Sequence, residues 1–144
     1  MLETARRDRG PAAFSAQYQQ NPTPPGGNRF RWEWFGTYPT ALPRQSFQCI
    51  VQSWDTGMTA EPTSDWSVCL TLGFHDTKWH LLDVFRRRMD YPVLKKQVVR
   101  LAREWALETS IIEDAATGKP LYQELRHEKS CGARLQLYRP TIDK

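Results

Sequence analysis

The chain has 144 residues, the size of one ordinary domain and enough to bury a core. Forty per cent of the residues are hydrophobic, with six Trp and six Phe, which argues against a disordered protein. The formal charge of +4 and the pI near 9.1 mildly favour a polyanionic partner such as nucleic acid, although many basic proteins bind nothing of the kind.

The three cysteines, Cys49, Cys69 and Cys131, are odd in number and lack CxxC spacing. This pattern indicates neither a disulfide framework nor a zinc site, and a reducing compartment, the cytoplasm, is expected. No apolar run approaches the roughly 20 residues of a membrane span, and Met1 to Gln20 contains no signal-peptide core. We therefore expect no membrane partner.

The first 46 residues differ from the rest of the chain. The stretch "NPTPPGGNRF" cannot continue a helix or a central strand, and it predicts an extended linker over residues 1–46. A disordered leader over residues 1–12 is an open alternative. From Phe47 the pattern changes to strands, so residues 47–144 are expected to form the folded domain.

The first half of this domain predicts three strands and a helix. The stretches "FQCIVQSWDT", "WSVCLTLGF" and "KWHLLDVFR" are expected to pair antiparallel, with a tight turn over residues 75–78. Asp90 can cap the helix that follows, and Pro92 suits its first turn. Its predicted buried face is apolar at helical spacing and comprises Leu94, Val98, Leu101, Ala102 and Trp105.

The second half predicts a strand, a helix and a last strand. The fourth strand is "TSIIED", and the fifth is "RLQLYRP". Between them, Thr117 can cap a helix that carries Leu121 and Leu125 on one face. The order is βββαβαβ, and the predicted fold class is α/β with a mixed sheet.

Acidic residues gather at the predicted strand ends. Asp55 closes the first strand, Asp65 opens the second, and Glu113 and Asp114 close the fourth. An antiparallel first pair would place Asp65 opposite Asp55, and a parallel fourth strand would bring Glu113 alongside. Clustered carboxylates repel one another unless a hard cation such as Mg²⁺ or Mn²⁺ binds them. Two such ions roughly 4 Å apart can catalyse phosphodiester cleavage.

Structural explanations compete with this metal site. Asp114 is better explained as an anion at the start of the second helix, and Asp65 suits an Asx turn as well as it suits a ligand. Asp55 and Glu113 are harder to dismiss, because a strand end in an apolar sheet is a poor place for an uncompensated charge. Trp66 and Trp54, which flank the site, are predicted to be core residues.

Basic residues offer candidate contacts to phosphate. Arg86 and Arg87, within the run "RRR", and Lys119 suit DNA phosphates, although a solvated strand end and a helix surface explain them equally well. The three histidines are scattered without ligand spacing. The chain contains no GxxxxGK[ST] phosphate loop for ATP.

Several motifs in order resemble one protein family. The stretches "FSAQYQQNP", "QSWDTG", "SDWSV", "LLDVFRRRMDYPVLKKQVV" and "IIEDAATG" resemble the C-terminal nuclease domain of the large terminase subunit of tailed bacteriophages and prophages, from about Phe14 to the end. The resemblance implies an RNase H-like fold and an acidic site for Mg²⁺ or Mn²⁺. It also implies a DNA endonuclease that cuts concatemeric double-stranded viral DNA by a two-ion mechanism. The implied partners are the packaging ATPase domain, the small terminase subunit and the portal, in the cytoplasm of a bacterial host.

The resemblance assigns roles to three acidic residues. Asp55 and Glu113 match the catalytic, metal-binding aspartate and glutamate, and Asp65 matches a further acidic metal-site position less securely. Family members usually supply another carboxylate from an Asp-rich segment at the start of a later helix, and this sequence stops at Lys144 before any such segment. We therefore interpret the chain as a fragment that lacks the ATPase, and we expect the isolated chain to bind metal poorly and to cut DNA slowly or not at all.

Two other functions are open from sequence. One is a non-catalytic DNA-binding or docking module of the packaging motor. The other is a different RNase H-like nuclease, of the resolvase or transposase type, against which the "AQYQQNP" stretch counts.

Overall fold

The computed structural model describes residues 32–115, 117–128 and 131–140, which fall into two units divided between Ala41 and Leu42. The described part of the first unit holds a short 3-10 helix, η1 (Trp32–Trp34). Residues 1–31 of the predicted linker, which was expected to span residues 1–46, lie outside the described residues. No helix among the described residues is long and apolar enough to cross a membrane.

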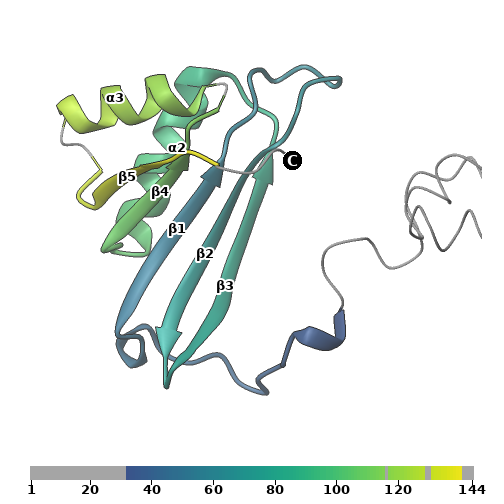
Figure 1. Ribbon diagram of the computed structural model, residues 1–144, viewed down its shortest axis with the longest axis vertical. Coiled ribbons are helices and arrows are strands. Elements are labelled where there is room, and N and C mark those ends of the chain that lie inside the picture. Colours follow the sequence, from purple (N-terminus) through teal and green to yellow (C-terminus); the bar gives the residue numbers. More distant parts are fainter. Residues whose placement is uncertain (1–31, 116, 129–130, 141–144) are drawn as a thin grey trace, which may run out of the picture. The chain divides into compact units, whose positions relative to one another are not determined.

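The second unit is a mixed five-stranded sheet with two helices (Figure 1). The strand order is β3-β2-β1-β4-β5, in which β1, β2 and β3 are antiparallel and β4 is parallel to β1 and to β5. The predicted α/β class and the βββαβαβ order are confirmed. After the 3-10 helix η2 (Arg44–Ser46), the elements are β1 (Cys49–Asp55), β2 (Ser67–His75), β3 (Lys78–Arg87), α2 (Tyr91–Glu104), β4 (Thr109–Glu113), α3 (Gly118–Glu128) and β5 (Arg134–Tyr138).

The β2–β3 hairpin closes with the predicted tight turn. His75 pairs with Lys78, which leaves Asp76 and Thr77 as the loop. Their φ angles are 46° and 62°, the left-handed conformations that a two-residue turn of this twist requires. The turn lies at the end of the sheet where β1 begins, because Cys49 pairs with Phe74.

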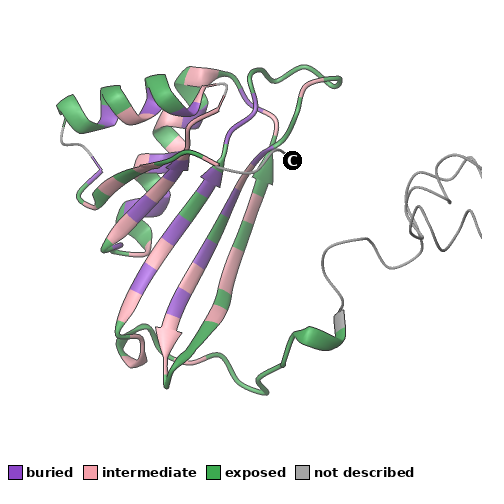
Figure 2. Cartoon of the chain, viewed as in Figure 1, coloured by how far each residue is buried: buried purple, intermediate pink, exposed green. Residues whose placement is uncertain are grey.

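One face of the sheet forms the core. Along β1 the side chains of Ile50, Gln52 and Trp54 are buried, and their neighbours point to the other face. Buried and less buried segments alternate along this strand in Figure 2. Both helices pack on this buried face, since their apolar residues join the same cluster. The helix residues in that cluster include Leu94, Val98, Leu101 and Ala102 of α2 and Leu121 and Leu125 of α3. The predicted apolar faces of both helices are confirmed except at Trp105, which follows the end of α2 at Glu104 and is only partly buried.

The opposite face of the sheet is far more accessible. Leu70, Trp79, Leu81 and Val84 are between 38% and 55% exposed. Trp79 packs against Phe74 across the hairpin, with ring centroids 5.1 Å apart. The two faces therefore differ, with the helices on one side and an accessible surface on the other.

The connection between β1 and β2 is attached to the start of helix α2. Asp90 occupies the N-cap position of α2, where its carbonyl oxygen accepts a hydrogen bond from the Leu94 amide at 2.9 Å. Its carboxylate makes no cap bond and instead accepts from the backbone N–H of Ala60 at 3.0 Å. The predicted cap residue thus anchors the connection as well as starting the helix.

Gly57 lies in the same connection at a very close backbone contact. A Cβ atom at Gly57 would lie 2.2 Å from the carbonyl oxygen of Asp65. The Gly57 amide also donates to the Ser67 hydroxyl at 3.0 Å. The chain can return toward β2 only because residue 57 has no side chain.

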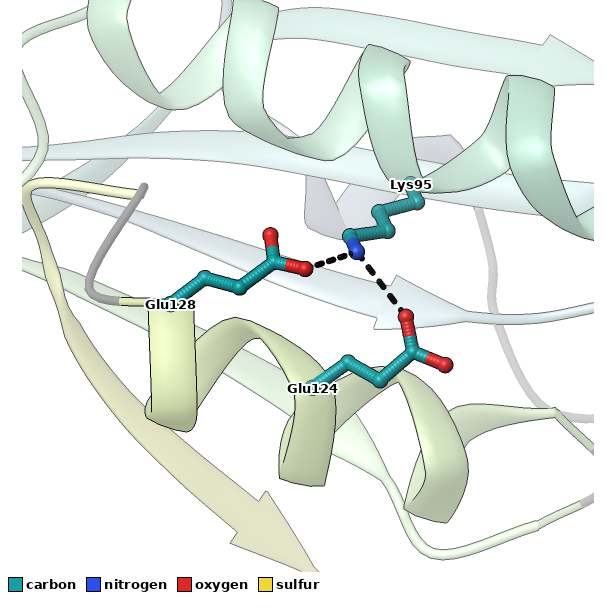
Figure 3. Close-up of polar contacts among 3 residues, drawn as sticks. All are labelled: Lys95, Glu124 and Glu128. Carbon is teal, nitrogen blue, oxygen red and sulfur yellow. Dashed lines mark hydrogen bonds and ion pairs between the residues drawn. The ribbon is translucent and has the colours of Figure 1, made fainter.

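A lysine joins the two helices. Lys95 of α2 forms ion pairs with Glu124, at 2.9 Å, and with Glu128, both on α3 (Figure 3). The hydrogen bond from Lys95 holds the pKa of Glu124 below its ordinary value of 4.5. Because the lysine side chain is 24% exposed and the glutamates about half exposed, solvent screens the attraction.

We predict that Gly57→Ala destabilises the domain, because backbone atoms must move to admit the new Cβ atom. The expected loss is about 1 to 3 kcal/mol in the free energy of unfolding, measured by urea denaturation. Gly36→Ala is the control, since a Cβ atom at Gly36 meets nothing within 4 Å. Equal stability of both variants would contradict the close contact at Gly57.

A second prediction concerns acid stability. A carboxylate with a lowered pKa stabilises the fold above its unfolded pKa, and this contribution is lost as pH falls through the folded value. The wild-type protein should therefore lose more stability between pH 7 and pH 3 than Lys95→Met, in which Glu124 has lost its cation. Lys96→Met, an exposed neighbour on α2, should behave like the wild type. An unchanged pH profile in Lys95→Met would refute the role of this ion pair.

Candidate functional site

The register of β1 with β4 places Asp55 and Glu113 next to each other. The parallel ladder pairs Ser53 with Ile111 and Trp54 with Ile112, and Asp55 and Glu113 are the next residues on the two strands. Adjacent strands lie about 4.8 Å apart. The two acidic residues thus occupy neighbouring positions at the C-terminal ends of β1 and β4. These two strands lie side by side in Figure 1.

Both acidic residues belong to the accessible face of the sheet. Trp54 and Ile112 are buried on the helix face, so the next residue on each strand faces the other way. Asp55 is exposed and Glu113 half-buried. The sheet therefore carries two carboxylates out of the core on one side, where a solvated ligand can reach them.

Backbone contacts fix the strand ends that carry these acids. The Thr117 hydroxyl donates to the carbonyl oxygen of Gly57 at 2.9 Å, which joins the segment after β1 to the segment after β4. A Cβ atom at Gly118 would lie 2.0 Å from the Glu113 carbonyl oxygen, so α3 begins in direct contact with the end of β4. The carbonyl of Thr117 accepts from the Leu121 amide at 3.1 Å, as expected for a helix start.

The prediction that Asp114 favours the helix start is wrong. Helix α3 begins at Gly118 and has no acidic residue in its first turn. The Asp114 amide instead donates to the Tyr138 carbonyl of β5 at 2.7 Å, which extends the β4–β5 pairing. Asp114 therefore belongs to the turn between Glu113 and the helix.

Asp65 does not lie opposite Asp55 at the start of β2, the position predicted from the sequence. Strand β2 begins at Ser67, and the residue opposite Asp55 is Val68. Within the residues that the structure describes, no group of three or more His, Cys, Asp or Glu side chains is placed to hold a metal ion. Asp65 therefore lies two residues before β2, and its role as a metal ligand stays a prediction.

The arginine run at the end of β3 divides between the two faces of the sheet. Arg86 pairs with Val68, which pairs in turn with Asp55, so these three residues form one row on the accessible face. Arg87 pairs with Ser67 and alternates to the other side. Lys119 is exposed in the first turn of α3, one residue after Gly118.

Trp54 and Trp66 have different environments. Trp54 is 1% exposed and is a core residue, as predicted. The same prediction for Trp66 is wrong, because its side chain is 37% exposed. The guanidinium carbons of Arg86 and Arg88 lie 4.1 and 3.9 Å from the centroid of the Trp66 ring. Side chains alternate between the two faces of a strand, so the run "RRR" could have indicated that Arg86 and Arg88 lie on the same face of the sheet.

The cysteine nearest to this region is structural. Cys69 pairs with Trp54 in the sheet and is fully buried, and burial raises the pKa of its thiol to about 12. The thiol therefore stays protonated at neutral pH and is not a nucleophile. The chemistry that the site can offer is that of carboxylate ligands beside basic side chains.

Comparison with known proteins identifies the family. The family model for the terminase RNaseH-like domain matches residues 52–142, well over half of the chain. No curated protein sequence matches.

Two solved structures, each 13% identical, are similar to the chain: the fowlpox virus Holliday junction resolvase (TM-score 0.48) and the Aquifex aeolicus member of the Ppx/GppA family (TM-score 0.40). The alignments cover 66% and 64% of this chain, and 64% and 35% of the other two. The assignment therefore depends on the family match. The mixed sheet confirms the predicted RNase H-like fold, and the chain belongs to the terminase RNaseH-like domain family.

Proposed function

We propose that this domain is the metal-dependent DNA endonuclease of a viral DNA-packaging terminase large subunit. The observation that carries the proposal is the parallel β1–β4 register, which puts Asp55 and Glu113 at adjacent strand ends on one accessible face. The family match supplies the nuclease fold. The substrate proposed is concatemeric double-stranded DNA, which the large subunit cuts for packaging.

The donor set fits a hard divalent cation. Carboxylate oxygens are the ligands that Mg²⁺ and Mn²⁺ prefer, and Mg²⁺ is commonly held by one or two carboxylates together with substrate phosphate and water. Asp55 and Glu113 would hold it. When bound, such ions supply charge stabilisation at the phosphorus and activation of the attacking water.

The other residues of the site have positioning roles in this proposal. Arg86, in the row of Asp55, and Lys119, beside the end of β4, would hold phosphates of the duplex without reading its bases. The side chain of Arg87 alternates to the other face of the sheet, so we assign it a smaller role in binding DNA phosphates. No covalent intermediate is required, in agreement with the buried, protonated Cys69.

The proposed assembly follows from the family. A terminase nuclease domain acts with the packaging ATPase domain, the small terminase subunit and the portal, in the cytoplasm of a phage-infected or prophage-bearing bacterium. These partners bring the duplex to the site, while this domain supplies the carboxylates.

One observation favours a second candidate function, a non-catalytic DNA-binding or docking module. The described residues bring together two carboxylates and no three-ligand group. A domain with only two ligands can retain the fold and the DNA-binding surface without efficient cleavage.

Metal binding and plasmid nicking together test the proposal. We expect Mn²⁺ binding, followed by electron paramagnetic resonance of free Mn²⁺, and slow Mn²⁺-dependent nicking of supercoiled plasmid. Asp55→Asn and Glu113→Gln should each weaken the binding and reduce nicking by at least about a hundredfold, because each removes several kcal/mol of charge stabilisation.

The matched control is Asp76→Asn, which removes the same charge from the hairpin turn at the other end of the sheet and should change neither readout. Metal binding and cleavage that survive both site substitutions would contradict the assignment of Asp55 and Glu113. Metal binding without any cleavage would favour the non-catalytic module.

A further inference from the structure

Trp66 organises two arginine side chains on the accessible face. The ring lies about 4 Å from the guanidinium carbons of both Arg86 and Arg88, at 4.1 and 3.9 Å. A guanidinium that stacks on an indole uses its flat face for the contact, and its N–H groups at the edge stay available to an anion. A single exposed tryptophan thereby holds two cations within about 4 Å of one ring.

Additional contacts restrict this cluster. The Nε of Arg88 donates to the Ser64 carbonyl at 2.7 Å, and the Arg88 side chain is half-buried. Arg86 is exposed. The ion pairs recorded between described residues use Lys95 and Arg100, so the two stacked arginines are not neutralised there. Two positive groups without an ion pair among the described residues therefore lie at this edge.

The cluster lies beside the candidate carboxylates. Arg86 and Asp55 flank Val68 in one row across three strands. Two inter-strand spacings amount to about 10 Å. Phosphates of one DNA strand follow one another every 3.4 Å or so along the helix axis. A duplex with its reacting phosphate at Asp55 thus presents other phosphates of the same strand to the arginines.

We propose that Trp66, Arg86 and Arg88 form a phosphate-binding clamp for the backbone of the DNA next to the cleavage site. This inference rests on the proposed function, because the clamp matters for cleavage only if Asp55 and Glu113 form the active site. Arg86 and Arg88 contact the phosphates, and Trp66 is a positioning residue that orients them. The planar, bidentate geometry of guanidinium suits phosphate oxygens.

Duplex binding in EDTA tests the clamp separately from the nuclease. The full 144-residue chain is titrated into a fluorescent DNA duplex, and Kd is measured between 50 and 200 mM KCl. Each lost phosphate contact should reduce the salt-induced rise in Kd by about 3.5-fold over this range. We expect that reduction in Arg86→Gln and in Arg88→Gln.

The tryptophan variants test positioning. Trp66→Ala should weaken binding and lower the salt dependence toward that of the arginine variants, whereas Trp66→Phe, which keeps an aromatic face, should retain both. Arg100→Gln is the matched control, because it removes the same charge from α2 on the other side of the sheet. Circular dichroism of each variant confirms that the fold is retained.

The inference is overturned if Arg86→Gln and Arg88→Gln keep the wild-type salt dependence, or if the wild-type chain does not bind DNA. A single-stranded oligonucleotide titrated in the same way gives a further check: if Trp66→Ala loses affinity for it with an unchanged salt dependence, the inference is overturned, since bases would then stack on the ring. The binding measurements are made in EDTA, which removes divalent metal. Their outcome therefore does not depend on whether the chain nicks DNA. Wild-type nicking with normal binding by all three variants would reject the clamp and retain the nuclease.

Discussion

The parallel pairing of β1 with β4 is the constraint on which the site depends. Strand alternation is fixed by burial, because Trp54 and Ile112 must face the helices and are 1% and 0% exposed. Each is followed by an acidic residue, so the burial of two apolar side chains determines where both carboxylates emerge. A slip of one residue on either strand would move one acid to the core face, which core packing prevents.

Close backbone contacts at two glycines stabilise the register of β1 with β4. Gly57 and Gly118 each allow a backbone approach that a Cβ atom would prevent, one against Asp65 and the other against Glu113. The Thr117 hydroxyl then joins the two loops through the Gly57 carbonyl. The glycines of "SWDTG" and "AATG" thus hold the acid-bearing strand ends in place.

Much of the fold was predictable from sequence because its pattern reflects burial. Apolar periodicity located every described strand and the buried faces of α2 and α3. Asp65, Asp114 and Trp66 were misplaced for a different reason. Their positions depend on where β2 and α3 begin and on a backbone turn closed by Tyr138, and composition near a loop does not determine such boundaries. Trp66 was assigned to the core by its type, although two arginines and solvent surround its ring.

The proposed nuclease site requires that Asp55 and Glu113 share one divalent ion. Crystals of the chain soaked in Mn²⁺ and measured at the manganese absorption edge give the most direct test, since anomalous scattering locates the metal without reference to activity. We expect an anomalous peak within coordinating distance, about 2.1 Å, of oxygens from both carboxylates. Manganese bound elsewhere, with none between Asp55 and Glu113, would contradict it.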